Sequence, residues 1–78
     1  MTSDNIFNIL KTIAVLSDKD DMTKEFNLIQ YKDLKNPILD LRKWDNTTNG
    51  KKMLKGITLT DDEARKLKDA LNEYYKEA

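Results

Sequence analysis

Two predicted strands carry aromatic and basic side chains on one face, a combination suited to contact with single-stranded nucleic acid. In residues 24–31 Tyr31 alternates onto this face, and in residues 38–44 Arg42 and Trp44 do the same. Lysine and arginine pair with phosphates, whereas flat rings stack on unpaired bases at roughly 1–3 kcal/mol for each base. The alternative is that both rings lie at the rim of the core among solvated lysines, and spacing alone leaves this open.

The composition excludes most enzyme chemistry. The 78 residues include no cysteine and no histidine, so the chain lacks a thiol nucleophile, an imidazole base and the usual ligands of zinc, haem and iron–sulfur clusters. Asp40 has no second catalytic group near it in sequence and is better explained as a partner of Arg42. The acidic run 61–63 is explained by a helix start. We therefore expect no enzyme activity, no metal and no cofactor.

The net charge of zero conceals a basic block in the middle of the chain. Residues 1–23 carry a net charge of −2, residues 24–56 carry +4 and residues 61–78 carry −2. Such segregation can place an anion-binding face on a neutral protein, although a purely solvated charge pattern explains it equally well.

The order of apolar and turn residues predicts four strands followed by one helix. Residues 6–16 fit either a strand or a helix by periodicity, and their β-branched and aromatic content favours a strand. A polar loop is expected at 17–21, further strands at 24–31 and 38–44, and a last strand at 51–59 after an Asn-Gly turn. Gly56 within the last strand indicates a bulge or a close backbone approach. The expected face for the core carries Phe26 and Leu39, and the face of Trp44 is expected to be open.

Residues 60–76 form the predicted helix. Thr60 and Glu63 have the spacing of a capping box, and an apolar stripe follows. We expect this stripe to cover one face of the sheet, which gives an α+β domain. A chain this short buries a marginal core without disulfides or metal, so homo-oligomerisation is the remaining standard means of stabilisation.

A single domain is expected over residues 1–78, with residues 1–5 flexible. No apolar run approaches the roughly 20 residues of a membrane span, and the polar start lacks the basic lead of a signal peptide. We therefore expect a soluble cytoplasmic protein that contacts no membrane.

Four ordered blocks resemble the C-terminal domain of the transcriptional coactivator positive cofactor four, and more closely its bacterial YdbC-like branch. They are Val15-Leu16-Ser17, then Thr23-Lys24-Glu25-Phe26-Asn27-Leu28, then Asp40-Leu41-Arg42-Lys43-Trp44-Asp45, and finally Lys52-Met53-Leu54-Lys55-Gly56-Ile57-Thr58-Leu59-Thr60. The resemblance implies four antiparallel strands, a C-terminal helix, and a homodimer whose curved sheets hold single-stranded DNA. Two positions depart from that branch: Asp21-Met22 stands in place of a Gly-Trp pair, and Leu54 in place of a glycine.

The resemblance also implies roles for individual residues. Arg42 and Lys55 match positions that meet phosphates, and Tyr31 and Trp44 match positions on which bases stack. Lys24, Asn27 and Lys32 are weaker candidates expected on the same side. The candidate nucleic-acid-binding residues are, in full, Lys24, Asn27, Tyr31, Lys32, Arg42, Trp44, Lys51, Lys52 and Lys55. The expected dimer interface is Ala64, Leu67, Leu71 and Tyr74.

Together these observations predict a homodimeric, nucleoid-associated protein that binds single-stranded DNA with little sequence preference. RNA is a variant of this ligand, and the process served is transcription regulation or DNA maintenance. The alternative function is a protein-interaction module that uses an exposed Trp44/Tyr31 patch.

Overall fold

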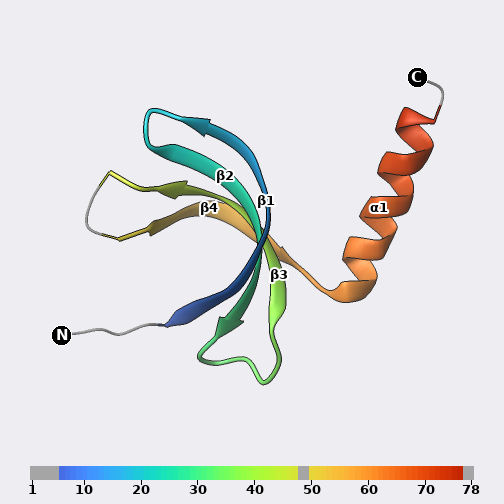
Figure 1. Ribbon diagram of the computed structural model, residues 1–78. Helices are drawn as coiled ribbons and strands as arrows, with labels where there is room; N and C mark the ends of the chain where they lie inside the picture. Colours follow the sequence, from blue (N-terminus) through green and yellow to red (C-terminus); the bar gives the residue numbers. More distant parts are fainter. Residues whose placement is uncertain (1–5, 48–49, 77–78) are drawn as a thin grey trace.

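The computed structural model describes residues 6–47 and 50–76, which form one curved antiparallel sheet followed by one helix (Figure 1). The strands are β1 (Phe7–Lys19), β2 (Met22–Tyr31), β3 (Ile38–Asp45) and β4 (Lys52–Leu59), and the helix is α1 (Asp61–Tyr75). The strands pair in the order β1-β2-β3-β4, each antiparallel to its neighbour. The predicted α+β class is confirmed. Residues 1–5, which were expected to be flexible, and Asn49 of the predicted Asn-Gly turn lie outside the described residues.

The first predicted segment is a strand, and it is longer than expected. Residues 17–19, assigned to a loop from their polarity, continue β1, and the turn to β2 shrinks to Asp20 and Asp21. Both turn residues have positive φ, 54° and 65°, as a tight two-residue hairpin turn requires. β1 also carries three register shifts against β2. Such bulges bend an edge strand and hinder its pairing with another chain.

The sheet has two unlike faces, which we call inner and outer. Alternation along β2 and β3 places Asn27, Tyr31, Arg42 and Trp44 on the inner face, and the outer face turns toward α1. Phe7 on β1 pairs with Tyr31 on β2, and Trp44 on β3 pairs with Thr23 on β2. These two partners lie eight residues apart along β2, which is about 26 Å in a straight strand. The ring centroids of Phe7 and Trp44 nevertheless lie 5.5 Å apart, because the sheet curls around its inner face.

This curl reverses the expected locations of core and open surface. The fully buried side chains are those of Ile29, Trp44, Asn27 and Asp40, all on the inner face that alternation alone had left open. Phe26 on the outer face, which the sequence assigned to the core, keeps part of its surface. The interior of the described chain is therefore small and largely polar.

The helix begins as the sequence predicts. The Thr60 hydroxyl accepts a hydrogen bond from the Glu63 backbone N–H at 3.1 Å, and the Glu63 carboxylate accepts one from the Thr60 N–H at 2.9 Å. Asp61 and Asp62 in the first turn add negative charge where the helix dipole favours it. This reciprocal cap fixes the point at which the chain leaves β4.

The helix does not pack onto the sheet, contrary to the expectation for its apolar stripe. Figure 1 shows α1 standing apart from the sheet, and within residues 61–75 no side chain is buried. Leu67 is 41% exposed, Leu71 48% and Tyr74 76%. Between the stripe and the outer face lies an open hollow of about 570 Å³, bordered by Ile13 and Phe26 as well as both leucines. In the described part of the chain, α1 is too short and too polar to cross a membrane.

Candidate nucleic-acid interface

Arg42 is held within the inner face by hydrogen bonds along its guanidinium group. Nε and Nη2 donate to the two carboxylate oxygens of Asp40, at 2.7 and 2.6 Å, and Nη1 donates to the carbonyl oxygen of Leu54 at 2.9 Å. The guanidinium group is planar, so this bidentate pair fixes its orientation as well as its charge. The hydrogen bonds that Arg42 donates to Asp40 raise the pKa of Arg42 above its ordinary value. Asp40 is thus the partner of Arg42 that the sequence indicated.

Tyr31 joins the same network through its hydroxyl group. The hydroxyl donates to the second carboxylate oxygen of Asp40 at 2.7 Å, and Nη2 of Arg42 approaches the phenol oxygen at 3.4 Å. Burial and the negative charge of Asp40 raise the pKa of Tyr31 to about 12, against an opposing contribution from Arg42. Tyr31 therefore stays neutral and continues to donate to Asp40 well above physiological pH.

Gly56 makes room for Arg42 where β3 and β4 pair directly. A Cβ atom on Gly56 would lie 1.9 Å from the Arg42 Cβ and 2.6 Å from the backbone oxygen of Leu41. Immediately beyond this pair, Lys43 faces two residues of β4, Leu54 and Lys55, which form a bulge. The close approach predicted from this glycine in a strand is confirmed. It also gives Arg42 access to the Leu54 carbonyl group.

A second polar network surrounds Glu25, nearer the β1–β2 turn. Its carboxylate accepts hydrogen bonds from Lys51 Nζ at 2.5 Å, from the Thr23 hydroxyl at 2.7 Å and from the Asn27 amide at 3.2 Å. Burial alone would raise the pKa of Glu25, but these hydrogen bonds and the charge of Lys51 lower it below its ordinary value. The Asn46 amide also donates to the Thr23 hydroxyl, at 3.1 Å. Lys51, predicted as a free phosphate contact, is thus already paired with a buried carboxylate.

Trp44 is enclosed by its own chain and has no exposed surface. The Phe7 ring packs against the indole at an interplanar angle of 52°, and Lys51 Nζ lies 5.3 Å from the ring centroid. A cation at this distance is attracted to the ring face. The exposed Trp44/Tyr31 patch expected for protein interaction is therefore not present: Trp44 is fully buried beneath Phe7, and Tyr31 is half-buried. The role of Trp44 in base stacking stays a prediction that requires Phe7 to move away.

Two buried polar atoms have no hydrogen-bond partner within the described ranges. They are the amide oxygen of Asn27 and the indole N–H of Trp44, an acceptor and a donor on the same inner face. Buried polar groups are ordinarily paired, and each unpaired one costs free energy. Both atoms would gain hydrogen bonds if solvent or a ligand entered the inner face.

The remaining predicted lysines are exposed but divide between the two faces and the turns. Lys24 points to the outer face and Asn27 to the inner face, so the expectation that these two share a side is wrong: they lie three positions apart in β2, and side chains alternate between the faces. Lys32 begins the turn after β2, where its N–H donates to the Ile6 carbonyl oxygen at 2.9 Å. Lys52 is the strand partner of Asp45 in the β3–β4 register, at the start of β4, and Lys55 lies in the bulge.

Metal ligands do not gather in the residues that the structure describes: no group of three or more carboxylate, cysteine or histidine side chains is close enough to hold an ion. The carboxylates of the two inner-face networks are each already engaged by a basic side chain. The side chains of the inner face make ionic contacts, hydrogen bonds and ring contacts.

Sequence reasoning missed Phe7, Glu25 and Thr23 as parts of the inner face. Glu25 and Thr23 could have been found, since both alternate with Asn27 and Tyr31 along β2. Phe7 could not, because its contact with Trp44 depends on how far the whole sheet curls.

Comparison with known proteins identifies the family of the chain. The sequence profile described as Transcriptional Coactivator p15 (PC4) matches residues 19–70, which include β2, β3, β4 and the first part of α1. No curated protein matches the chain. The match spans well over half of the residues, and the order of four antiparallel strands and one helix agrees with it, so the chain belongs to the transcriptional coactivator p15 (PC4) family.

Proposed function

We propose that the protein is a homodimer that binds single-stranded DNA with little sequence preference and without enzyme activity. Membership of the PC4 family supports a nucleic-acid-binding, coactivator-like role and carries the proposal. The exposure of Lys24, Lys32, Lys52 and Lys55 supports contact with phosphates. We further propose the YdbC-like branch, a cytoplasmic location at the nucleoid, and a role in transcription regulation or DNA maintenance.

Phosphate contacts account for most of the affinity in this proposal. The four exposed lysines have no ion pair within the described residues, so their charges remain available to a polyanion. Lysine contacts to the backbone are largely independent of sequence and release condensed counterions, which makes binding depend on salt. Arg42, with a side chain 15% exposed and a bidentate carboxylate partner, chiefly organises the inner face.

Base stacking on Trp44 requires Phe7 to move away from the indole. Phe7 is the first residue of an edge strand and pairs with Tyr31, so displacement of this end breaks few strand contacts. A base that took its place would meet the indole ring and the two unpaired polar atoms of Asn27 and Trp44. Stacking is therefore a second step that follows the phosphate contacts.

The distribution of apolar surface supports the homodimer. The apolar side chains of the outer face and of α1 leave the described chain with an uncovered apolar hollow, bordered by Phe26, Leu39, Ala64, Leu67 and Leu71. Burial of this apolar surface against a second copy would add apolar burial that the small, largely polar interior of one chain does not provide. Ala64, Leu67 and Leu71 of the predicted interface border this hollow, and Tyr74 continues the stripe on α1.

Fluorescence anisotropy with a labelled oligo-dT tests the function directly. The same label on a duplex and on oligo-rU separates single-stranded DNA from duplex and from RNA, and two salt concentrations report the ionic contribution. Tight binding to oligo-dT that weakens with salt and exceeds duplex binding is expected. Absence of binding at low salt, with the protein folded by circular dichroism, would refute the proposed ligand.

A further inference from the structure

The outer face carries a row of residues that crosses all four strands. On β2 the row passes through Lys24, which lies two positions from Phe26 on the side of the β1–β2 turn. Ser17 on β1 pairs with Lys24 on β2, and Lys24 pairs directly with Lys43 on β3. Lys43 in turn faces the bulge that contains Lys55 on β4. We call Ser17, Lys24, Lys43 and Lys55 the lysine row. Neighbouring strands lie about 4.8 Å apart, so its three lysines lie within about 10 Å across the sheet.

The lysine row concentrates positive charge that the protein does not neutralise. Lys24, Lys43 and Lys55 are exposed, and within residues 6–47 and 50–76 none of them forms an ion pair. Like charges directly opposite one another on a sheet are destabilising. Other basic side chains of the same chain do have carboxylate partners, among them Arg42 and Lys51. The row therefore presents positive charge that an anion from outside the chain can neutralise.

A hollow beside the row offers space for such a ligand. It measures about 440 Å³ and is bordered by Ser17, Lys19, Lys24 and Lys43, with Met22, Thr23 and Asp20 completing the border. The hollow beneath α1, in contrast, is bordered mainly by apolar side chains such as Phe26 and Leu71. The outer face is thus divided into an apolar part under the helix and a cationic part near the turn.

We propose that the lysine row binds the phosphodiester backbone of a nucleic-acid strand across the outer face, as a path separate from the enclosed inner face of Arg42 and Trp44. This inference rests on the proposed function and adds Lys43 and Ser17, neither of which was among the candidate nucleic-acid-binding residues. Lysines act as point charges on the backbone and the Ser17 hydroxyl can donate to a phosphate oxygen, so the contacts carry no base information. The row leaves the apolar part under α1 free for a second copy of the chain.

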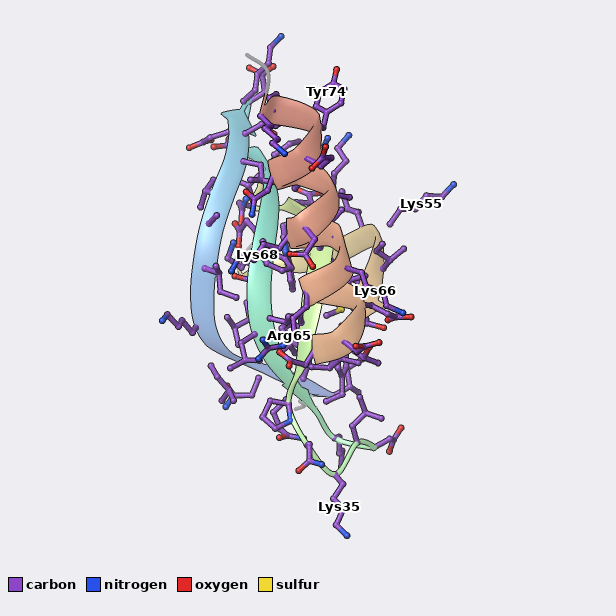
Figure 2. All side chains as sticks on the ribbon, turned by 90° about the vertical axis from the view of Figure 1, so that its right-hand side faces the viewer. Lys35, Lys55, Arg65, Lys66, Lys68 and Tyr74 are labelled. Carbon is purple, nitrogen blue, oxygen red and sulfur yellow. The ribbon has the colours of Figure 1, made fainter. Side chains whose placement is uncertain are left out.

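The test compares two double variants that lose the same charge. Lys24→Gln/Lys43→Gln removes the directly paired lysines of the row. Lys11→Gln/Lys35→Gln removes two exposed lysines that also lack ion pairs in the described chain and lie on β1 and on the β2–β3 turn, where Figure 2 labels Lys35. Anisotropy titrations with labelled oligo-dT over a series of salt concentrations give the slope of log affinity against log salt for each protein.

The row variant is expected to lower the magnitude of this slope by about 1.4, since each lost single-strand phosphate contact contributes about 0.7. The control variant should change it by less than half as much. Equal changes in the two variants, or an unchanged slope in the row variant, would overturn the inference while leaving the proposed function in place. If the wild-type protein does not bind oligo-dT, both fall together.

A charge reversal provides an independent readout that separates binding from folding. Lys43→Glu places a carboxylate directly opposite Lys24, so the thermal unfolding midpoint should rise or stay unchanged while affinity for oligo-dT falls at least as far as in the double variant. A Lys43→Glu protein that is as stable as the wild type and binds equally well would also overturn the inference.

Discussion

The ring of Phe7, at the start of the edge strand β1, packs against Trp44 on β3 with 5.5 Å between the ring centroids. The two residues lie far apart in the strand register, so their contact closes the curled sheet over its inner face. Phe7 thereby determines whether the indole is accessible to solvent or to a base.

Phe7→Ala should therefore expose Trp44. The expected results are a shift of tryptophan emission to longer wavelength, greater quenching by acrylamide, and a loss of about 1–3 kcal/mol in the free energy of unfolding. Phe7→Leu keeps an apolar cover and should lie much closer to the wild type. Trp44 is the single tryptophan, so its emission reports this site alone. Emission and quenching unchanged in a folded Phe7→Ala protein would show that Phe7 does not cover the indole.

Gly56→Ala tests the close approach of β4 to Arg42. The new Cβ would meet backbone atoms of Leu41 and Arg42 as well as the Arg42 Cβ, so the strands must separate. We expect a loss of about 1–3 kcal/mol in the free energy of unfolding, measured by urea denaturation. Thr58→Ala, two residues along the same strand, is the matched control and should cost less. A Gly56→Ala protein as stable as this control would contradict the packing.

Alternation correctly predicted which residues share a face, but it could not predict which face would be buried. Asn27 with Tyr31, and Arg42 with Trp44, lie together as expected, and Gly56 lies where a close approach was predicted. The degree of curl depends on long-range contacts such as Phe7 with Trp44, and these have no local sequence signal.

The capping box fixed where the helix begins, and its apolar stripe was visible in the sequence. The position of α1 beside the sheet could not be predicted, because a stripe shows that a surface is apolar without showing what covers it. Lys51 illustrates the same limit at one residue: its partner Glu25 lies 26 positions away in the chain. The succession of four strands and one helix along the chain, by contrast, required only turn signals and local patterns.

Tyr31 should ionise in a separate step with a pKa of about 12, seen as tyrosinate absorbance on alkaline titration. Its neutral form is favoured by folding, so this contribution to stability is complete below the ordinary pKa of 10 and is lost as pH rises toward 12. Tyr31→Phe should abolish the late step, and Asp40→Asn should move it to lower pH. An alkaline titration of the wild type without a late step would contradict the hydrogen bond to Asp40.

The pairing of Glu25 with Lys51 should make stability fall in acid. Folding lowers the pKa of Glu25 from an ordinary value of 4.5, so its contribution is present above that pH and is lost as pH falls through the lower, folded value. At neutral pH, Lys51→Ala leaves a buried carboxylate without its cation and should cost about 1–3 kcal/mol of unfolding free energy. The exposed neighbour is the control, and Lys52→Ala should cost under about 0.5 kcal/mol. The two variants should converge at low pH, and a constant difference between them would contradict this role of Glu25.

Self-association through the helix stripe predicts that Leu71→Asn weakens a dimer. Leu71 is 48% exposed and borders the apolar hollow between α1 and the outer face, so a second copy would bury it. Full burial of a leucine contributes about 1.5–3 kcal/mol, and loss of this contact should shift the equilibrium toward monomer at a fixed concentration. Light scattering after size exclusion measures the mass, and the unfolding midpoint of the wild type should rise with protein concentration. Glu73→Gln, an exposed change about 200° away around the helix, should leave the mass unchanged. A wild-type protein that remains monomeric at all concentrations would contradict the interface, and the hollow would then need another occupant.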